Sequence, residues 1–313
     1  MKERGKLIFY ISIVAAAILW GTIGLFFQFL SEYNLSRMEI VFVRTIVAAV
    51  LLLLYLLIFD RGKLKIRWQD LWMFLGTGVA SLLFFNYCYF SAMEYTSLSV
   101  AAVLLYTAPA FVTILSAIFF KDRFTGRKIL ALILTIPGCA VISGVFSGLV
   151  NGSFSYSSTG ILFGLGSGFG YALYTIFSRI ALRRYDSITI SFYTFVLAGI
   201  GSGLLCSPIH VASRMSSPPA LLLGIGIAAA TCLIPYLLYT YGLTRIGNSE
   251  ASITATIEPL AATCISVFIL GEPFTLEKLI GIVLILGAVL IINLPDRSHH
   301  ASDVSAEPSS PIS

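Results

Sequence analysis

Ten long apolar segments follow one another along almost the whole of this 313-residue chain. A helix needs roughly 20 apolar residues to cross the hydrocarbon core of a membrane. The chain is 58% hydrophobic and only 11% charged, whereas about a quarter of a soluble domain is charged. This composition argues against a water-soluble enzyme, a nucleic-acid-binding protein and a disordered regulator. We therefore expect an all-α integral membrane protein. The predicted spans are residues 7–30, 38–59, 70–92, 97–120, 128–146, 158–179, 187–208, 219–242, 247–270 and 276–294.

Basic residues lie mostly on one side of these spans. With the N-terminus in the cytoplasm, 16 of the 20 Lys and Arg residues fall at cytoplasmic ends and loops, 3 fall outside, and Arg44 lies within a span. Cytoplasmic loops of membrane proteins carry such an excess of Lys and Arg. The net charge of +5 is thus a sign of topology and does not require a nucleic-acid partner. We expect a multi-pass plasma-membrane protein with both termini cytoplasmic and a first helix that is retained, not cleaved as a signal peptide.

The sequence predicts no metal site and no cofactor. Glycines in residues 164–170 and 199–203 recur at the four-residue spacing that lets helices approach closely, and no phosphate-binding Gly-x-x-x-x-Gly-Lys pattern accompanies them. His299 and His300 fall in the polar C-terminal tail. Each of the five cysteines lies in a different apolar run, without disulfide or metal spacing, so we expect small buried apolar residues. They are Cys88, Cys139, Cys206, Cys232 and Cys264.

An internal repeat appears when the sequence is shifted by 150 residues. The alignment matches prolines, polar residues and charges in one register without a gap, which general apolar similarity does not explain. Each half then holds five spans, and an odd number means that the halves enter the membrane from opposite sides. Such inverted repeats are common in secondary transporters, whose substrate sites lie at the repeat interface near the membrane midplane. The matches include Tyr89/Tyr239, Pro109/Pro259, Thr113/Thr263, Phe124-Thr125/Phe274-Thr275 and Lys128/Lys278.

The repeat sets the predicted organisation of the chain. Residues 1–146 and 158–295 form the two five-helix halves, and an outer linker at 147–157 joins them. A disordered cytoplasmic tail follows at 296–313. Short motifs in a fixed order make the chain resemble the EamA-like family of the drug/metabolite transporter superfamily. They are Trp20-Gly21, Arg44, Pro109, Tyr171-Ala172, Glu258-Pro259, Gly271-Glu272 and Phe274-Thr275.

This resemblance covers residues 7–294 and implies a ten-helix carrier of small metabolites, often an exporter of amino acids or related compounds. The first half departs from the family pattern at Lys121-Asp122, where the family has Gly-Glu and where the second half has Gly271-Glu272. The acidic charge is kept, so the departure concerns only the local end of the helix.

Two ionisable residues, Arg44 and Glu258, lie well inside predicted spans, and such residues are functional candidates because inserting them into a membrane is costly. They lie in different halves, and the repeat partner of Glu258 is Ala108. We hypothesise that Arg44 receives a carboxylate while Glu258 meets an amine or carries a coupling proton, as a zwitterionic substrate requires. The alternatives are a structural ion pair, or an Arg44 side chain that extends outward to the membrane surface.

Prolines and aromatic residues complete the predicted site. Pro109 and Pro259 each follow the middle of a span, where a proline removes a backbone hydrogen bond, and they are candidate hinges or fixed kinks. Aromatic residues with a polar group suit amphipathic metabolites. The candidates for the substrate or proton pathway are Trp20, Asn86, Tyr89, Tyr171 and Tyr239, together with Arg44 and Glu258.

The sequence therefore predicts a secondary transporter that works by alternating access and exports amino acids or related amphipathic compounds. The predicted partners are the lipid bilayer and a small-molecule substrate. An intramembrane enzyme is disfavoured because no mid-membrane Ser–His pair, Asp pair or His-Glu-x-x-His motif is present. The alternatives within transport are a carrier of nucleotide-sugar or lipid-like substrates and an uncoupled, channel-like facilitator.

Overall fold

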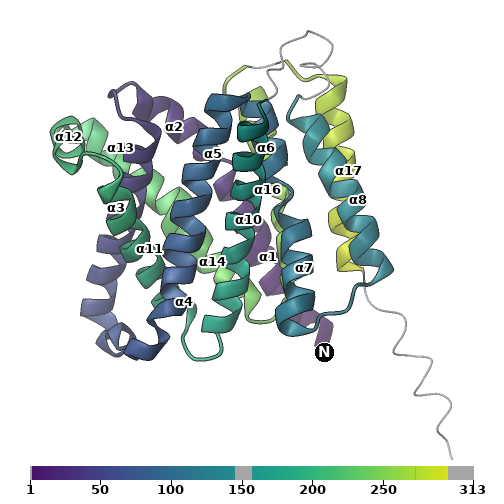
Figure 1. The fold of residues 1–313 in the computed structure, drawn as a ribbon, viewed down its shortest axis with the longest axis horizontal. Helices are drawn as coiled ribbons and strands as arrows, with labels where there is room; N and C mark the ends of the chain where they lie inside the picture. Colours follow the sequence, from purple (N-terminus) through teal and green to yellow (C-terminus); the bar gives the residue numbers. More distant parts are fainter. Residues whose placement is uncertain (1, 145–156, 272, 295–313) are drawn as a thin grey trace, which may run out of the picture.

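The computed structural model describes residues 2–144, 157–271 and 273–294. Within them, every regular element is a helix, and the helices run up and down through one layered bundle (Figure 1). The predicted tail at 296–313, with His299 and His300, lies outside the described residues, as does the predicted linker apart from Ser157. The prediction of an all-α protein is confirmed.

The first half of the chain forms five spans from a larger number of helical segments. The first, third and fourth predicted spans are each divided into shorter helices, and 3-10 turns connect the second span to the third. The elements are α1 (Lys2–Trp20), α2 (Ile23–Ser31), α3 (Arg37–Phe59), η1 (Arg61–Leu64), η2 (Trp68–Asp70), α4 (Leu71–Leu75), η3 (Gly76–Leu83), α5 (Phe84–Tyr95), α6 (Leu98–Leu105), α7 (Ala108–Phe120) and α8 (Gly126–Ile142).

The second half repeats this pattern. Its third and fourth spans are again divided, and a short extra helix, α12, precedes the eighth span of the chain. The elements are α10 (Ser158–Ala181), α11 (Ser187–Leu204), α12 (Pro208–Arg214), α13 (Pro218–Ala228), η4 (Ala229–Leu233), α14 (Ile234–Leu243), α15 (Asn248–Ala255), α16 (Ile257–Phe268) and α17 (Leu276–Asn293).

Nine helical segments in the described part of the chain are long and apolar enough to cross a membrane. The remaining predicted span, the fifth at 128–146, corresponds to α8, whose 17 residues include Pro137 and end four residues earlier than the sequence pattern suggested. α8 packs along α17 (Figure 1). Large apolar side chains face outward around the bundle, as lipid contact requires. Examples are Ile118, Phe119 and Val283, which are 65%, 61% and 61% exposed.

Irregular segments recur at equivalent places in the two halves. Backbone of the π-helical type spans Gly76–Leu83 in the third span and Ala229–Leu233 in the eighth. The fourth span is interrupted at Tyr106-Thr107 and the ninth at Thr256. Residues shifted by 150 thus share backbone irregularities as well as sequence. Mid-helix π segments and breaks of this kind often accompany functional sites.

Polar contacts at the helix ends follow the same repeat. The Lys128 ammonium donates to the carbonyl of Arg123 at 3.3 Å, and the Lys278 ammonium donates to the carbonyl of Pro273 at 3.0 Å. The two acceptor positions are again 150 residues apart. Lys121 adopts the left-handed backbone conformation, with φ of 57°, and so does its partner Gly271, with φ of 72°. The turn is therefore conserved between the halves, although a non-glycine residue adopts this conformation at a cost of about 1–2 kcal/mol.

Glycines allow close helix contacts where the sequence predicted them. A methyl group on Gly164 or Gly168 of α10 would lie within 3 Å of Leu104, and one on Gly170 would lie 2.9 Å from Phe84. The predicted role of the glycines in packing is thus confirmed.

The five cysteines are free thiols. Cys88, Cys139 and Cys232 are buried, but Cys206 and Cys264 are partly exposed, so the prediction that all five are buried is wrong for these two.

Packing between α8 and α17 gives a stability prediction. A methyl group on Gly281 would lie 2.7 Å from the Ile142 side chain, whereas one on Gly287 of the same helix would meet nothing within 4 Å. We expect Gly281→Ala to destabilise the protein by about 1–3 kcal/mol because the helices must separate. Gly287→Ala is the matched control, because it should leave stability unchanged or slightly raised. Thermal unfolding of both variants in detergent checks this, and equal melting temperatures would contradict the packing argument.

Two polar clamps occupy equivalent positions at opposite ends of the bundle. At the end that holds the N-terminus, the Lys63 ammonium lies 2.9 Å from the Asp186 carboxylate, joining the loop after the second span to the start of α11. At the other end, His210 of α12 lies 2.8 Å from Glu39 near the start of α3. Each clamp joins the loop after one span to the first turn of its neighbour.

The Lys63–Asp186 clamp is expected to be insensitive to pH between about 5.5 and 8.5. Burial alone would raise the pKa of Asp186, but hydrogen bonds from the Thr189 backbone N–H and from Lys63 lower it overall. The hydrogen bond to Asp186 raises the pKa of Lys63. A lowered carboxyl pKa stabilises the fold above the ordinary Asp value near 3.9, and the effect is lost only as the pH falls through the lower folded value.

Asp186→Asn tests this expectation. The variant keeps a side chain able to cap α11 but removes the charge that pairs with Lys63. We expect its melting temperature to fall by the same small amount at pH 5.5 and pH 8.5. A difference between variant and native protein that disappears at the lower pH would contradict the prediction.

Candidate functional site

The interruptions in the fourth and ninth spans bring two helix N-termini to the middle of the bundle. α7 begins at Ala108, and α16 begins at Ile257. The start of an α-helix carries unsatisfied N–H groups and a partial positive charge. Pro109 and Pro259 lie in the first turns of these half-helices, where the missing N–H of proline costs little. The prolines therefore begin helices after a break and do not kink continuous ones, and their role as hinges stays a prediction.

A small cavity lies between these two helix starts. It has a free volume of about 10 Å³, enough for about one water molecule. The hydroxyl of Ser252, at its wall, has no hydrogen-bond partner among the described atoms. Ala108 and Glu258, partners in the repeat, both line it. The other lining residues are Leu105, Tyr106, Pro109, Tyr171, Ser252, Ala255 and Thr256.

Glu258 is the acidic residue of this cavity. Its side chain is partly accessible and lies in the first turn of α16, where the helix dipole favours a negative charge. The Tyr171 hydroxyl donates to its Oε2 at 3.5 Å, a long and weak hydrogen bond. No basic side chain in the described part of the chain forms an ion pair with it. The carboxylate is therefore available to a cationic group or a proton.

Tyr171 also borders a second cavity of about 10 Å³, which is lined mainly by aromatic rings. Trp20 is one of its lining residues and packs against three tyrosines, with ring-centroid distances of 5.3 Å to Tyr236, 5.4 Å to Tyr239 and 6.1 Å to Tyr171. Hydrogen bonds of 2.7 Å fix two of the rings, Tyr174 to Thr240 and Tyr239 to Thr175. The lining residues are Trp20, Ser81, Phe85, Tyr171, Tyr174, Thr175, Tyr236 and Tyr239.

Arg44 is buried near the aromatic cavity and is only 2% exposed. Its Nη2 donates to the Asn86 side-chain oxygen at 3.3 Å, and Asn86 in turn donates to the carbonyl of Leu82 at 2.7 Å. The Arg44 Nε has no partner, and no described acidic residue forms an ion pair with this guanidinium. The side chain is thus neither paired with Glu258 nor extended to the membrane surface. A buried guanidinium in this state is suited to receive an anion.

The structure brings most of the candidate residues into one region. Trp20, Tyr171 and Tyr239 share the aromatic cavity, Tyr171 links it to Glu258, and Asn86 contacts Arg44. Tyr89 is partly buried and packs 5.9 Å from the Phe90 ring. The sequence analysis did not select Tyr174 or Tyr236. The repeat offered a signal for the latter, because Tyr236 is the shifted partner of Asn86.

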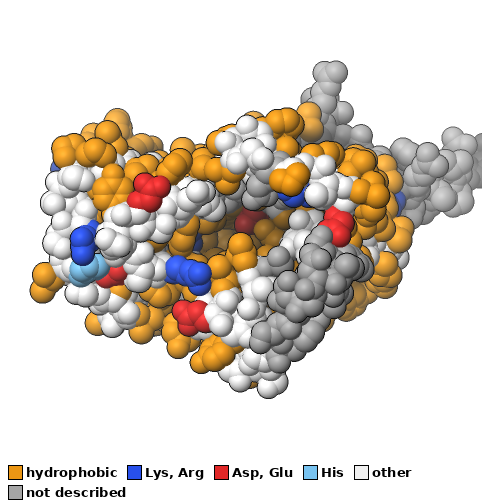
Figure 2. All heavy atoms as spheres, turned by 90° about the horizontal axis from the view of Figure 1, so that it is seen from above, with side chains coloured by type: hydrophobic (Ala, Val, Ile, Leu, Met, Phe, Trp, Pro, Cys, Tyr) orange, Lys and Arg blue, Asp and Glu red, His pale blue; other side chains and the backbone are white. Residues whose placement is uncertain are grey.

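Access to this region differs between the two ends of the bundle. Seen from the end opposite the N-terminus, the surface is hollowed at its centre, with largely apolar walls and an acidic side chain at depth (Figure 2). Toward the N-terminal end, side chains join the spans below the cavities. Asn248 donates to Ser116 at 3.0 Å, Lys128 lies 3.9 Å from Glu250, and Arg179 bonds to the carbonyl of Leu243. The conformation is therefore open toward one end and closed toward the other.

Comparison with known proteins gives a consistent picture. The model of the EamA-like transporter family matches residues 7–144 and again 158–294. An uncharacterized transporter of Archaeoglobus fulgidus is 31% identical over 280 residues, covering 90% of this chain and 94% of its own. The uncharacterized inner membrane transporter YicL of Salmonella typhimurium is 26% identical, covering 92% and 95%. These names support a transport role for the family and not an enzymatic one.

The fold itself also has a solved counterpart. A crystal structure with 16% sequence identity superposes with a TM-score of 0.76, and the match covers 95% of this chain and 99% of that one. At this identity the likeness concerns the fold alone. It shows that the ten-helix arrangement described above is found in another protein.

Proposed function

Because this chain belongs to the EamA-like transporter family and is a multi-pass membrane transporter, we propose that it exports zwitterionic metabolites, such as amino acids or related amphipathic compounds, by alternating access. The observation that carries the proposal is a pair of charges without ion-pair partners: the buried Arg44, which has no acidic partner among the described residues, and the partly accessible Glu258, which has no basic one. A zwitterion satisfies both, and neither a simple anion nor a simple cation does.

Different residues of the site are suited to the two charged groups of a zwitterionic substrate. The Arg44 guanidinium offers planar N–H donors that match a carboxylate, and the free Nε adds to them. Glu258 meets the amine directly or exchanges a proton as the amine arrives. The ring faces of Trp20 and the surrounding tyrosines attract a cation and pack against apolar side chains. A substrate of this kind is small, amphipathic and of zero net charge.

Alternating access is supported by the pseudo-symmetry of the gates. The π-helical segments and the broken spans occur once in each half, so a change in one half has a counterpart of opposite direction in the other. The cavities around Tyr171 hold only about one water each, so a substrate requires these helices to move apart. We further propose a plasma-membrane location with both termini cytoplasmic, on the basis of the distribution of Lys and Arg.

The proposal is tested by the small molecules that appear in the medium of cells. Cells expressing the native chain are compared with cells expressing equal amounts of Glu258→Gln and with cells lacking the chain. The proposal predicts that one or more amino acids or related amines accumulate outside only with the native chain. If the three cultures do not differ, the proposed export of zwitterions is wrong. If the compounds accumulate equally with the native chain and with Glu258→Gln, the proposed role of Glu258 is wrong.

A further inference from the structure

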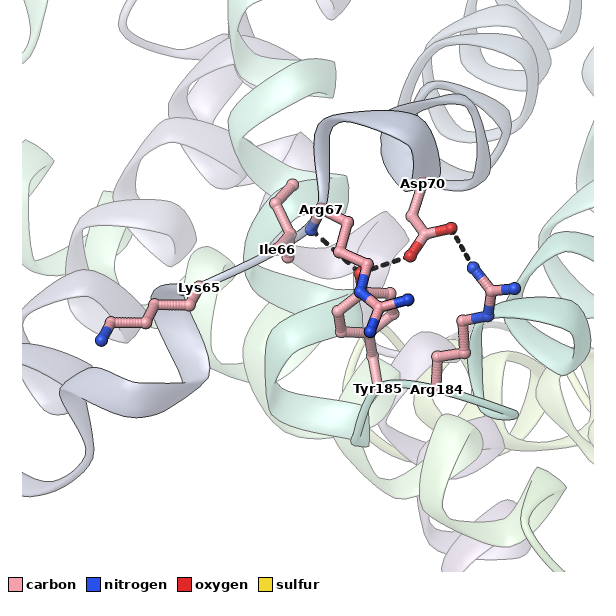
Figure 3. A pocket seen from close by; sticks show the side chains of 6 residues that line it. All are labelled: Lys65, Ile66, Arg67, Asp70, Arg184 and Tyr185. Atoms are coloured by element: carbon pink, nitrogen blue, oxygen red, sulfur yellow. Dashed lines mark hydrogen bonds and ion pairs between the residues drawn. The ribbon is translucent and has the colours of Figure 1, made fainter.

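Another pocket lies away from the candidate substrate site, at the end of the bundle that holds the N-terminus. Its volume is about 430 Å³, and it lies between the loop that precedes the third span and the loop that follows the sixth (Figure 3). It thus lies at a junction of the two halves of the repeat. The residues that line it are Lys65, Ile66, Arg67, Asp70, Arg184 and Tyr185.

One negative charge in this pocket is already neutralised. The Asp70 carboxylate, only 2% exposed, is paired through Oδ1 with Arg184 and accepts a hydrogen bond from the Tyr185 hydroxyl at 2.7 Å through Oδ2. The Tyr185 oxygen in turn accepts the backbone N–H of Arg67 at 3.1 Å. These contacts hold the two loops together and leave no free carboxylate to oppose an anion (Figure 3).

Two positive charges remain uncompensated. The side chains of Arg67 and Lys65 are exposed and form no ion pair with any described residue. The Arg67 side chain extends from the first loop past Tyr185, on the side of Arg184, whereas the Lys65 side chain points away from the other side chains drawn (Figure 3). With Arg184 balanced by Asp70, the Arg67 guanidinium leaves the pocket with a net positive charge, which suits a phosphate group bound by a guanidinium fork, and Lys65 adds a second positive charge to the same loop.

The pocket also lies at the depth of lipid headgroups. Trp68 lies between the lining residues Arg67 and Asp70 in sequence, and Trp72 follows them at the start of the third span; the two side chains are 86% and 48% exposed. Exposed indoles at the end of a span are typical of the membrane–water interface. A phosphate at this level is within reach of a lipid whose acyl chains run along the third span, and clusters of basic residues beside a span attract anionic lipids.

We propose that this pocket binds the phosphate group of an anionic phospholipid from the adjacent leaflet. The same two loops are joined by the Lys63–Asp186 clamp, and the first of them is also held to α11 by the Tyr193 hydroxyl, which donates to the carbonyl of Leu64 at 2.6 Å. A bound lipid therefore stabilises the closed end of the bundle. The inference does not depend on which substrate is carried or in which direction.

Native mass spectrometry of the purified protein, titrated with phosphatidylglycerol or phosphatidylcholine, tests the inference. We expect phosphatidylglycerol to bind about tenfold more tightly than phosphatidylcholine, and Arg67→Gln to remove this preference. Arg67→Gln keeps the backbone N–H that bonds Tyr185, so the loops should remain folded. Arg245→Gln, which removes an exposed positive charge outside the pocket at the same end of the bundle, is the matched control.

A soluble probe distinguishes the source of the phosphate. Glycerol 1-phosphate is added at millimolar concentration, and its own binding and its competition with the lipid are measured. Weak or absent binding of glycerol 1-phosphate supports a lipid headgroup as the ligand. If glycerol 1-phosphate binds as tightly as the lipid, the pocket is a phosphate site for a soluble ligand, and the proposed lipid is wrong. If Arg67→Gln binds phosphatidylglycerol like the native chain, or if Arg245→Gln weakens binding equally, the pocket is not a phosphate site.

Discussion

Transport by the Glu258→Gln variant is expected to fall at least about a hundredfold. Glutamine keeps the size of the side chain and still accepts a hydrogen bond from Tyr171, so the fold should be unchanged. The variant cannot pair with an amine or bind and release a proton. A hundredfold loss corresponds to about 2.8 kcal/mol, which is within the range of about 2–5 kcal/mol for truncating one partner of a hydrogen-bonded charge pair at a binding interface.

The measurement is efflux from vesicles that hold equal amounts of native or variant protein. The control is Glu94→Gln, which removes an exposed carboxylate near the C-terminal end of α5, the helix that carries Asn86. This variant should transport normally. Exchange of internal for external substrate separates the two roles of Glu258. Exchange that persists in Glu258→Gln indicates a proton carrier, and exchange that is lost indicates contact with the amine. Full net efflux by the variant would contradict both roles.

The second large effect is expected at Arg44. Arg44→Met should reduce transport about fiftyfold or more, because the carboxylate of the substrate loses its buried partner. Arg44→Lys keeps the charge but loses the planar fork, so we expect an intermediate rate with a KM raised about tenfold. An analogue without a carboxylate should be carried equally well, or equally poorly, by Arg44→Met and the native chain.

Thermal stability separates a substrate-binding Arg44 from a structural one. The guanidinium is buried without an acidic partner among the described residues, so replacing it with an apolar side chain of similar length should leave stability unchanged or increase it. Arg37→Gln at the exposed start of α3 is the control for loss of charge. A large fall in the melting temperature of Arg44→Met, in parallel with transport, would show that Arg44 supports the fold.

Much of the fold was predictable because the length of each apolar run and the internal repeat can be read directly from the sequence. The spans and the inverted order of the halves required only apolar runs and a shift of 150 residues. The interruptions at Tyr106-Thr107 and Thr256 were not predicted, because each span is, as a whole, long and apolar enough to cross the membrane as a single helix. Pro109 and Pro259 marked the places, but a proline indicates a kink or a helix start equally well from sequence alone.

The candidate site was predictable in its charges and less so in its packing. Arg44 and Glu258 were conspicuous because charged groups are rare inside spans. That Arg44 bonds to Asn86 and leaves its Nε free depends on the approach of α3 to the third span, which no sequence pattern specifies. Tyr174 and Tyr236 were not selected because tyrosines are frequent in these spans, and only the packing around Trp20 distinguishes them.

The central claim is that this protein is a carrier with one zwitterion site that alternates between two sides. The most direct test is counterflow in liposomes containing the purified protein, loaded with the unlabelled amino acid identified in the medium and diluted into a trace of the labelled one. The account predicts transient accumulation of label above its external concentration, which disappears in Glu258→Gln or Arg44→Met. Label that only equilibrates, at a rate unaffected by internal substrate, would indicate a channel and contradict alternating access.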